Sequence, residues 1–81
     1  MHLEILTPEK KIFEGDVSIV TFPGANGSFQ VMDNHAPLIS LLQDGTIEYK
    51  GKEGAKKISV IGGVVEVLKN KVIVLATGIA A

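Results

Sequence analysis

The chain has 81 residues, 46% of them hydrophobic and 21% charged, so it should fold as one domain over residues 1–81 with a single core. A net charge of −1 and the absence of Arg, the residue best suited to bidentate phosphate and base contacts, argue against a nucleic-acid partner. Without Cys the core has no disulfide framework, which favours a reducing compartment.

Short segments rich in branched residues alternate with turn residues along the chain, which is typical of an all-β protein. The first half predicts strands over 2–6, 11–14, 17–22, 27–32 and 38–42. Pro8 closes the first strand because proline cannot donate to a β-ladder, and Pro23-Gly24 is predicted to end the third. The apolar content of 17–22 and 38–42 predicts strands that are buried.

The second half predicts two hairpins. Residues 46–50 and 55–61 flank the glycine-bounded loop 51–54. Gly62-Gly63 indicates a bend or bulge, and Asn70-Lys71 is predicted to turn strand 64–69 into strand 72–77. About nine or ten short strands are too many for one flat sheet of this length, so we predict an all-β fold in which they stack as two antiparallel layers.

Neither an export signal nor a membrane span is predicted. The first residues, 1–4, lack the basic start of a signal peptide. The longest apolar stretch, 72–81, contains Thr77 and Gly78 and falls short of the roughly 20 residues that cross a bilayer. We therefore expect no membrane insertion.

Catalytic and metal sites find little support in the sequence. A metal site needs several converging ligands, and His2 and His35 are far apart without a ligand-like spacing. A hydrolase could use Ser40, His35 and Asp33, but neither a nucleophile elbow nor an oxyanion loop precedes Ser40. A His35 that is hydrogen-bonded at a turn is the simpler interpretation.

Two lysine features leave other binding roles open. Lys71, after Asn70, occupies a hairpin position similar to the modified lysine of biotinyl and lipoyl carrier domains, although the surrounding carrier motif is absent. Lysines also gather near residues 50–57, where they form either a solvated hairpin end or a docking patch for an acidic partner. Residues 23–27 resemble a phosphate loop only loosely, because no Lys-Ser/Thr pair follows.

Ordered motifs along residues 2–78 carry a family resemblance. Residues 23–38 contain Pro-Gly, then Gly-x-Phe-x-Val, then His-Ala-Pro-Leu. Residues 6–15 combine Thr-Pro-Glu with Phe-Glu-Gly, while residues 42–47 and 61–67 contain Leu-x-x-Gly-x-Ile and Gly-Gly-x-x-Glu-Val. In this order the motifs resemble the N-terminal β-sandwich domain of the ε subunit of the F-type ATP synthase. The resemblance implies a ten-stranded β-sandwich of two antiparallel sheets, in agreement with the strand count above.

The resemblance implies a non-catalytic role on the central stalk. Family members are held by the γ subunit, rest on the c-ring and turn with the rotor, coupling proton-driven rotation to ATP synthesis. By position, the resemblance implies γ-subunit contacts for Thr7, His35 and Ser40. It implies a peripheral location at the cytoplasmic face of the bacterial inner membrane, no cofactor, and a monomer in isolation.

The loop before Phe29 is where family members meet the c-ring. The resemblance therefore implies c-ring contacts for Asn26, Gly27 and Ser28. Many relatives carry an acid at the position of Ser28, so an ion pair is not expected there. Most bacterial members continue into a C-terminal helical hairpin that restrains ATP hydrolysis; here the sequence stops at Ala81, so we expect this inhibitory function to be absent. Whether the natural protein continues is left open.

Overall fold

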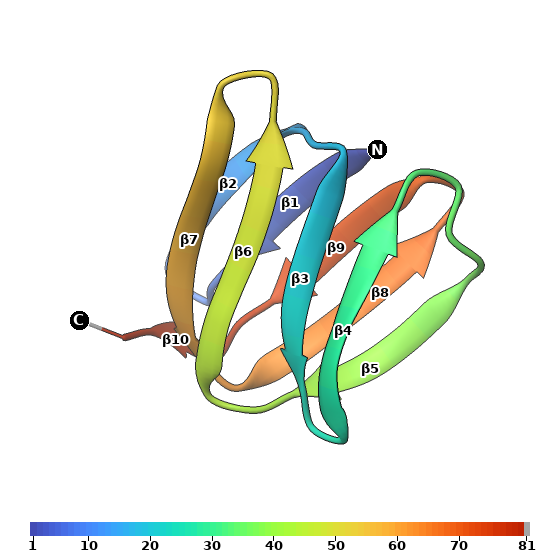
Figure 1. Cartoon of the computed structure of the whole chain (residues 1–81). Coiled ribbons are helices and arrows are strands. Elements are labelled where there is room, and N and C mark those ends of the chain that lie inside the picture. The colour runs from blue at the N-terminus through green and yellow to red at the C-terminus, as the bar shows by residue number, and fades with distance from the viewer. Residues whose placement is uncertain (81) are drawn as a thin grey trace.

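The computed structural model describes residues 1–80, which form strands and turns without a helix (Figure 1). The ten strands follow one another through short connections. Their bounds are β1 His2–Leu6, β2 Lys11–Asp16, β3 Ile19–Gly24, β4 Gly27–Met32, β5 Leu38–Leu42, β6 Gly45–Gly51, β7 Gly54–Ile61, β8 Gly63–Leu68, β9 Lys71–Leu75 and β10 Gly78–Ile79. The predicted all-β, ten-stranded fold is confirmed.

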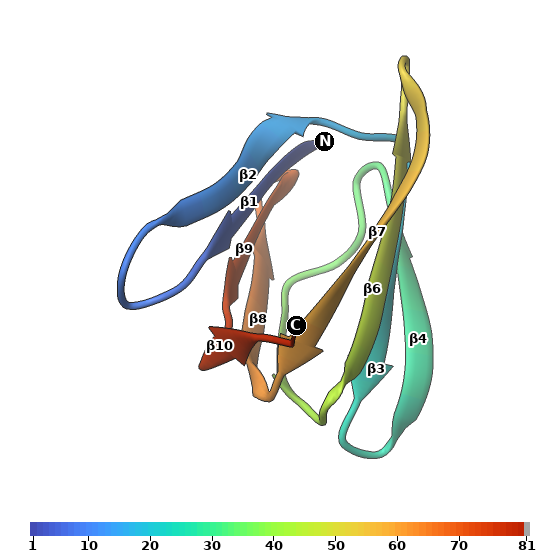
Figure 2. The same cartoon turned by 90° about the vertical axis from the view of Figure 1, so that its left-hand side faces the viewer.

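The strands stack as two layers, which Figure 2 shows edge-on. The first layer has the order β4-β3-β6-β7-β10, and the second has the order β5-β8-β9-β1-β2. The layers are not separate sheets, because Gly24 of β3 pairs with Leu42 of β5 and joins them at one corner. The pairing is antiparallel except between β1 and β9, which run parallel. The sandwich is thus a single sheet curled onto itself.

One hydrophobic core lies between the layers. Strand alternation turns every second side chain inward, so β1, β3, β8 and β9 each contribute a buried pair. Side chains of this core that are almost completely buried include Leu3, Ile5, Val20, Phe22, Val31, Ile47, Val60, Val65, Val67, Val72 and Val74. Burying each one stabilises the fold by about 1.5–3 kcal/mol before the entropy of ordering the chain is counted.

Glycines and asparagine make the tight turns of the second layer. Gly63 has φ 131°, and a Cβ atom there would lie 2.5 Å from the Leu75 carbonyl oxygen, so only glycine fits. Lys69 and Asn70 both have positive φ, 51° and 61°, as a two-residue hairpin turn of type I′ requires. The predicted turn at Asn70-Lys71 therefore lies one residue earlier, and Lys71 begins β9.

The prediction for the third strand was displaced by two residues. Strand β3 begins at Ile19 and runs through Pro23-Gly24, which was predicted to stop it. Pro23 is tolerated because the pairing of β3 with β6 ends at Thr21, so no backbone N–H is needed from Pro23 on that side. The Pro23 carbonyl accepts a hydrogen bond from the Gln43 backbone amide at 2.9 Å. Burial alternates along β3, so the strand is covered on one face and not on both.

Candidate partner-docking face

Most of the outward surface of β5, β8 and β9 is apolar, although it covers no other part of the chain. Pairing places Leu41 beside Val64, Val64 beside Leu75, and Leu75 beside Leu6, which makes an uninterrupted apolar row across the second layer. We call this surface the apolar face. Its members are Leu6, Ile39, Leu41, Val64, Leu68, Ile73 and Leu75.

The apolar face is exposed to solvent. Ile39 is 71% exposed, Leu41 67%, Leu75 51% and Leu68 48%. Single exposed aliphatic side chains are normal, but a contiguous group of them is typical of an interaction surface. Strand β5 was predicted to be buried, and this prediction was wrong: β5 is at the edge of its layer, and only its inward side chains face the core.

A charged border lies beside the apolar face, on β1 and β2. The Lys11 ammonium lies 2.5 Å from the Glu14 carboxylate and 3.3 Å from that of Glu4. Hydrogen bonding, first to Glu14 and then to Glu4, raises the pKa of Lys11, and the same contact with Lys11 lowers the pKa of Glu14. His2 Nε2 adds a second contact to Glu14 at 2.9 Å. These charged groups therefore have partners within the chain and do not require one from another protein.

Two hollows open on the surface. A shallow depression of about 360 Å³ lies at the edge of the apolar face and is lined by residues 37–39 and 66–68. A cleft of about 290 Å³ lies between β2 and the β6–β7 hairpin, where the rings of Phe13 and Tyr49 pack with centroids 4.6 Å apart. Desolvation raises the pKa of Tyr49. Within residues 1–80 no side-chain polar atom is left buried without a partner, so neither hollow presents an orphaned group to a ligand.

Thr7 and His35 lie at opposite ends of the second layer. Thr7 follows β1, and its hydroxyl donates to the Lys10 carbonyl at 3.1 Å, so it holds the β1–β2 turn. His35 is exposed in the β4–β5 loop, where its Nδ1 donates to the carbonyl oxygen of Ala36 at 2.7 Å. The prediction of a hydrogen-bonded histidine at a turn is confirmed.

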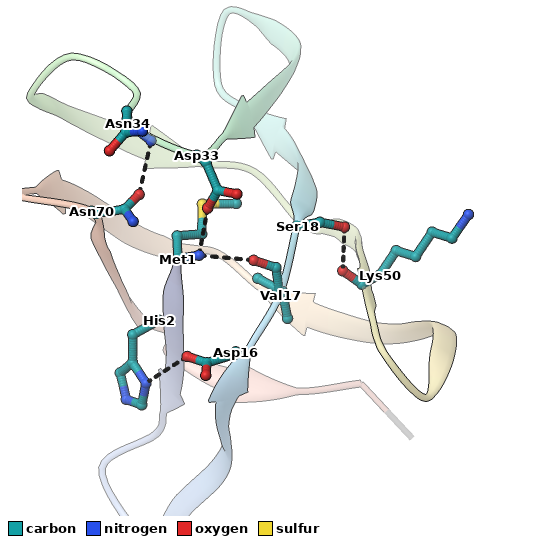
Figure 3. Close-up of polar contacts among 9 residues, drawn as sticks. All are labelled: Met1, His2, Asp16, Val17, Ser18, Asp33, Asn34, Lys50 and Asn70. Atoms are coloured by element: carbon teal, nitrogen blue, oxygen red, sulfur yellow. Dashed lines mark hydrogen bonds and ion pairs between the residues drawn. The ribbon is translucent and has the colours of Figure 1, made fainter.

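The β4–β5 loop that carries His35 is held in place by polar contacts (Figure 3). The Asn34 backbone N–H donates to Asn70 Oδ1 at 2.8 Å, which ties this loop to the β8–β9 turn. The Met1 ammonium donates to Asp33 at 2.5 Å and to the Val17 carbonyl at 3.0 Å. The loop is therefore a defined surface at the end of the second layer.

Ser40 belongs to β5, between Ile39 and Leu41 of the apolar face. It pairs with the buried Val65, so its side chain faces the same side of the sheet as Val65 and away from its two exposed neighbours. Its hydroxyl donates to the Leu41 carbonyl at 3.2 Å. Of the three sequence positions for γ contact, Thr7 and His35 thus lie at the ends of the apolar face, whereas the Ser40 side chain lies on the other side of the sheet. The aliphatic side chains of the face were not anticipated.

The β3–β4 turn projects from one end of the first layer (Figure 1). Asn26 and Gly27 are exposed there, and Ser28 is exposed on the first residues of β4. Gly27 has φ 123° with open space around it, so the turn depends on glycine for its backbone and not for close packing. Asn26, Gly27 and Ser28 therefore lie together, on a turn that adjoins the Leu41 end of the apolar face, where the Ala25 backbone amide donates to the Leu41 carbonyl at 2.9 Å.

The structure does not bring together the hydrolase candidates. Ser40 donates to a backbone carbonyl, His35 to another, and the Asp33 carboxylate contacts the Met1 ammonium. Lys71, the carrier candidate, begins a strand and is not at a turn tip. The part of the chain that the structure describes contains no cluster of three or more potential metal ligands. It also contains no helix with the length and apolar character to cross a membrane.

Curated relatives match almost the whole chain. The chain is 48% identical over 79 residues to the ATP synthase epsilon chain of a Nitratiruptor species, and 44% identical over 79 residues to that of Campylobacter concisus. Both alignments cover 96% of this chain and 61% of the relative. The chain thus spans less than two thirds of the length of these relatives.

Solved structures share the fold at low sequence identity. A chain of the Euglena gracilis mitochondrial ATP synthase, in a structure of OSCP, F1 and the c-ring, superposes with a TM-score of 0.89 at 18% identity and covers 96% of this chain and 51% of that one. A chain of the Tetrahymena thermophila mitochondrial ATP synthase central stalk and c-ring superposes with a TM-score of 0.82 at 17% identity, covering 98% and 64%. The family model described as "ATP synthase, Delta/Epsilon chain, beta-sandwich domain" matches residues 1–81, so the chain belongs to this family.

Proposed function

We propose that this chain is a non-catalytic rotor domain of an F-type ATP synthase, held by the γ subunit through the apolar face and resting on the c-ring through the β3–β4 turn. In this role it helps to couple proton-driven rotation to ATP synthesis, at the cytoplasmic face of the bacterial inner membrane. The exposed apolar face is the observation that carries the proposal. A folded chain that leaves Ile39 and Leu41 about two-thirds exposed gains stability when a partner covers them.

The positions of the two surfaces support simultaneous binding. The apolar face lies on the outward side of the second layer, whereas Asn26, Gly27 and Ser28 lie at one end of the first layer. The two surfaces belong to different layers and adjoin where the Ala25 amide donates to the Leu41 carbonyl, so the two partners would bind at neighbouring surfaces. In this proposal Thr7 and His35 contact γ at the two ends of the apolar face, whereas Ser40 faces the other side of the sheet and is assigned no side-chain contact through this face.

The stiffness of the sandwich suits a part that transmits torque. Core side chains from both layers pack in one cluster, and close-packed protein interiors have low compressibility. The backbone pairing of Gly24 with Leu42 also joins the layers at one corner, so shear between the layers is resisted there.

Capture of γ tests the first contact. The immobilised chain, incubated with purified γ subunit of the same organism, is expected to retain γ as a full-length ε subunit does. Failure to retain γ under conditions in which the full-length subunit succeeds would contradict the proposal.

Site-directed cross-linking tests the second contact. The chain contains no Cys, so Ser28→Cys provides a unique thiol on the β3–β4 turn. In the assembled enzyme this thiol is expected to cross-link to the c-ring, and the control Ser59→Cys, on the outward side of β7, is not. Equal cross-linking of both variants would remove the support for a c-ring contact at this turn.

A further inference from the structure

Glu66 is a single carboxylate within the apolar face. It lies on β8 with its side chain outward and exposed. Pairing places Ile39 on one side of it and Ile73 on the other, while Val64 and Leu68 precede and follow it on the same face. The four directly adjacent outward neighbours of Glu66 are therefore aliphatic. Lys71, which is beside Leu68, is its diagonal neighbour, and the two form no salt bridge.

Other outward glutamates of the sheet have cationic partners within the chain, and Glu66 does not. Glu4 contacts Lys11 at 3.3 Å, and Glu48 contacts Lys57 at 3.3 Å. Among residues 1–80, no cation lies within 4.0 Å of the Glu66 carboxylate, and it accepts no hydrogen bond. In the isolated chain its charge is therefore stabilised by solvent and not by a counter-ion.

A hollow beside Glu66 has room for a side chain of a partner. The depression of about 360 Å³ has Glu66 in its lining, together with Pro37, Ile39 and Leu68. It therefore combines aliphatic walls with one negative group. A long cationic side chain fits such a site well, because its methylene stem packs on the walls while its charged head reaches the carboxylate.

Covering the apolar face removes water from Glu66. A carboxylate that is buried without a counter-ion is strongly unfavourable, so an entirely aliphatic partner surface would be rejected. A partner that places one cation opposite Glu66 restores the lost solvation. Arg suits this role better than Lys, because its planar guanidinium can donate two parallel hydrogen bonds to one carboxylate and is more weakly hydrated.

We infer that Glu66 is a specificity-determining residue, which selects a partner surface that presents one cationic side chain, preferably Arg, surrounded by aliphatic residues. The inference rests on the proposed docking of γ on the apolar face and specifies the chemistry of that contact. It assigns to the aliphatic residues the driving force of binding, and to Glu66 the choice and register of the partner.

Binding of γ to three variants tests the inference by calorimetry. Glu66→Gln keeps the shape and removes the charge, and we expect roughly 30-fold or greater loss of affinity, as for truncation of one partner of a buried charge pair. Glu66→Lys is expected to abolish binding. Glu53→Gln, at the exposed β6–β7 turn, is the matched control and should change affinity less than about twofold.

A charge-swap in γ makes the test specific. Exchanging the cation of γ that faces Glu66 for Glu should restore binding to Glu66→Lys and to no other variant. If Glu66→Gln binds as tightly as the unmodified chain, the role of Glu66 is overturned while γ docking stands. If the unmodified chain itself does not bind γ, the docking proposal and this inference both fall.

Discussion

The outward surfaces of the two layers differ in the chemical character of their side chains, although both are made of paired β-strands. On the first layer, most outward side chains are polar and several pair with one another: Gln30 donates to Thr21 at 3.2 Å, and Lys57 contacts Glu48 at 3.3 Å. Met32 and Ile61, at the ends of β4 and β7, are exposed exceptions. On the second layer, the corresponding positions of β5, β8 and β9 hold the apolar face, with Leu41 67% exposed.

The difference indicates which outward surface is stable in water without a partner. The first layer forms its cross-strand polar pairs without help, so a partner would have to displace them. The second layer leaves aliphatic side chains in water and one glutamate without a counter-ion. A bound partner would cover the aliphatic side chains and place a cation beside the glutamate. We therefore assign docking to the second layer, and the following experiments test that contrast.

The largest expected effect comes from disrupting the second layer at Gly63. Gly63→Ala forces a Cβ to within 2.5 Å of the Leu75 carbonyl oxygen at φ 131°, and backbone atoms cannot move aside. We expect a loss of at least about 2 kcal/mol in the free energy of unfolding, measured by urea denaturation. Gly54→Ala is the control: its φ of 101° is also positive, but its Cβ would meet open space, so the loss should be smaller. Equal losses would contradict the packing explanation.

A charge in the apolar face should weaken docking without unfolding the chain. We expect Leu41→Asp to reduce affinity for γ by roughly 30-fold or more, because it places an unpaired charge within the apolar face that γ covers. Since Leu41 is already exposed, stability should change by less than about 0.5 kcal/mol. The matched variant Ser59→Asp, on the outward side of β7, should bind as the unmodified chain does. A comparable loss for Ser59→Asp would show that docking does not distinguish the layers.

Acidification should affect the charged border of the second layer. Lys11 and His2 lower the pKa of Glu14 in the folded chain, so its ionised form contributes stability above the ordinary glutamate pKa of 4.5. This contribution is lost as pH falls through the lower pKa of the folded state. In urea titrations at decreasing pH, the stability difference between the unmodified chain and Glu14→Gln should therefore shrink. A difference that stayed constant to low pH would contradict the Lys11–Glu14 contact.

The smallest effect is expected on the first layer. Glu48→Gln removes the exposed pair with Lys57, and such surface pairs contribute between about 0 and 1 kcal/mol. We expect a change in thermal midpoint of only a few degrees at most, and unchanged binding of γ. A marked loss of γ binding would move the docking surface to the first layer.

Much of the fold could be predicted because strand alternation and turn residues are local signals. Strands β1, β4 and β5 begin and end where the pattern indicated, and the Gly62-Gly63 bend is present. Strand β10 was not assigned separately, since Gly78–Ile79 is too short to show a period and pairs with β7 only after the chain has folded.

The docking face was harder to predict because exposure depends on how the layers stack. Ile39 and Leu41 are as apolar as core residues, so the pattern alone predicted that the whole of β5 lies inside. Strand alternation turns them outward, and they are exposed because no other strand of the described chain covers the outer side of this layer. Motifs indicated Thr7, His35 and Ser40 by position, but no local pattern distinguished Glu66 from the other outward acids. Its aliphatic neighbours include Ile39, which the fold brings beside it from a strand distant in sequence.

Methyl NMR spectra of the chain titrated with γ test the central claim most directly, because both outward surfaces carry methyl groups. We expect the signals of Ile39, Leu41 and Leu75 to shift or broaden, while those of Thr21, Thr46 and Ala55 on the first layer stay in place. Perturbation of the first-layer methyls, with the second-layer signals unchanged, would contradict the assignment of docking to the apolar face.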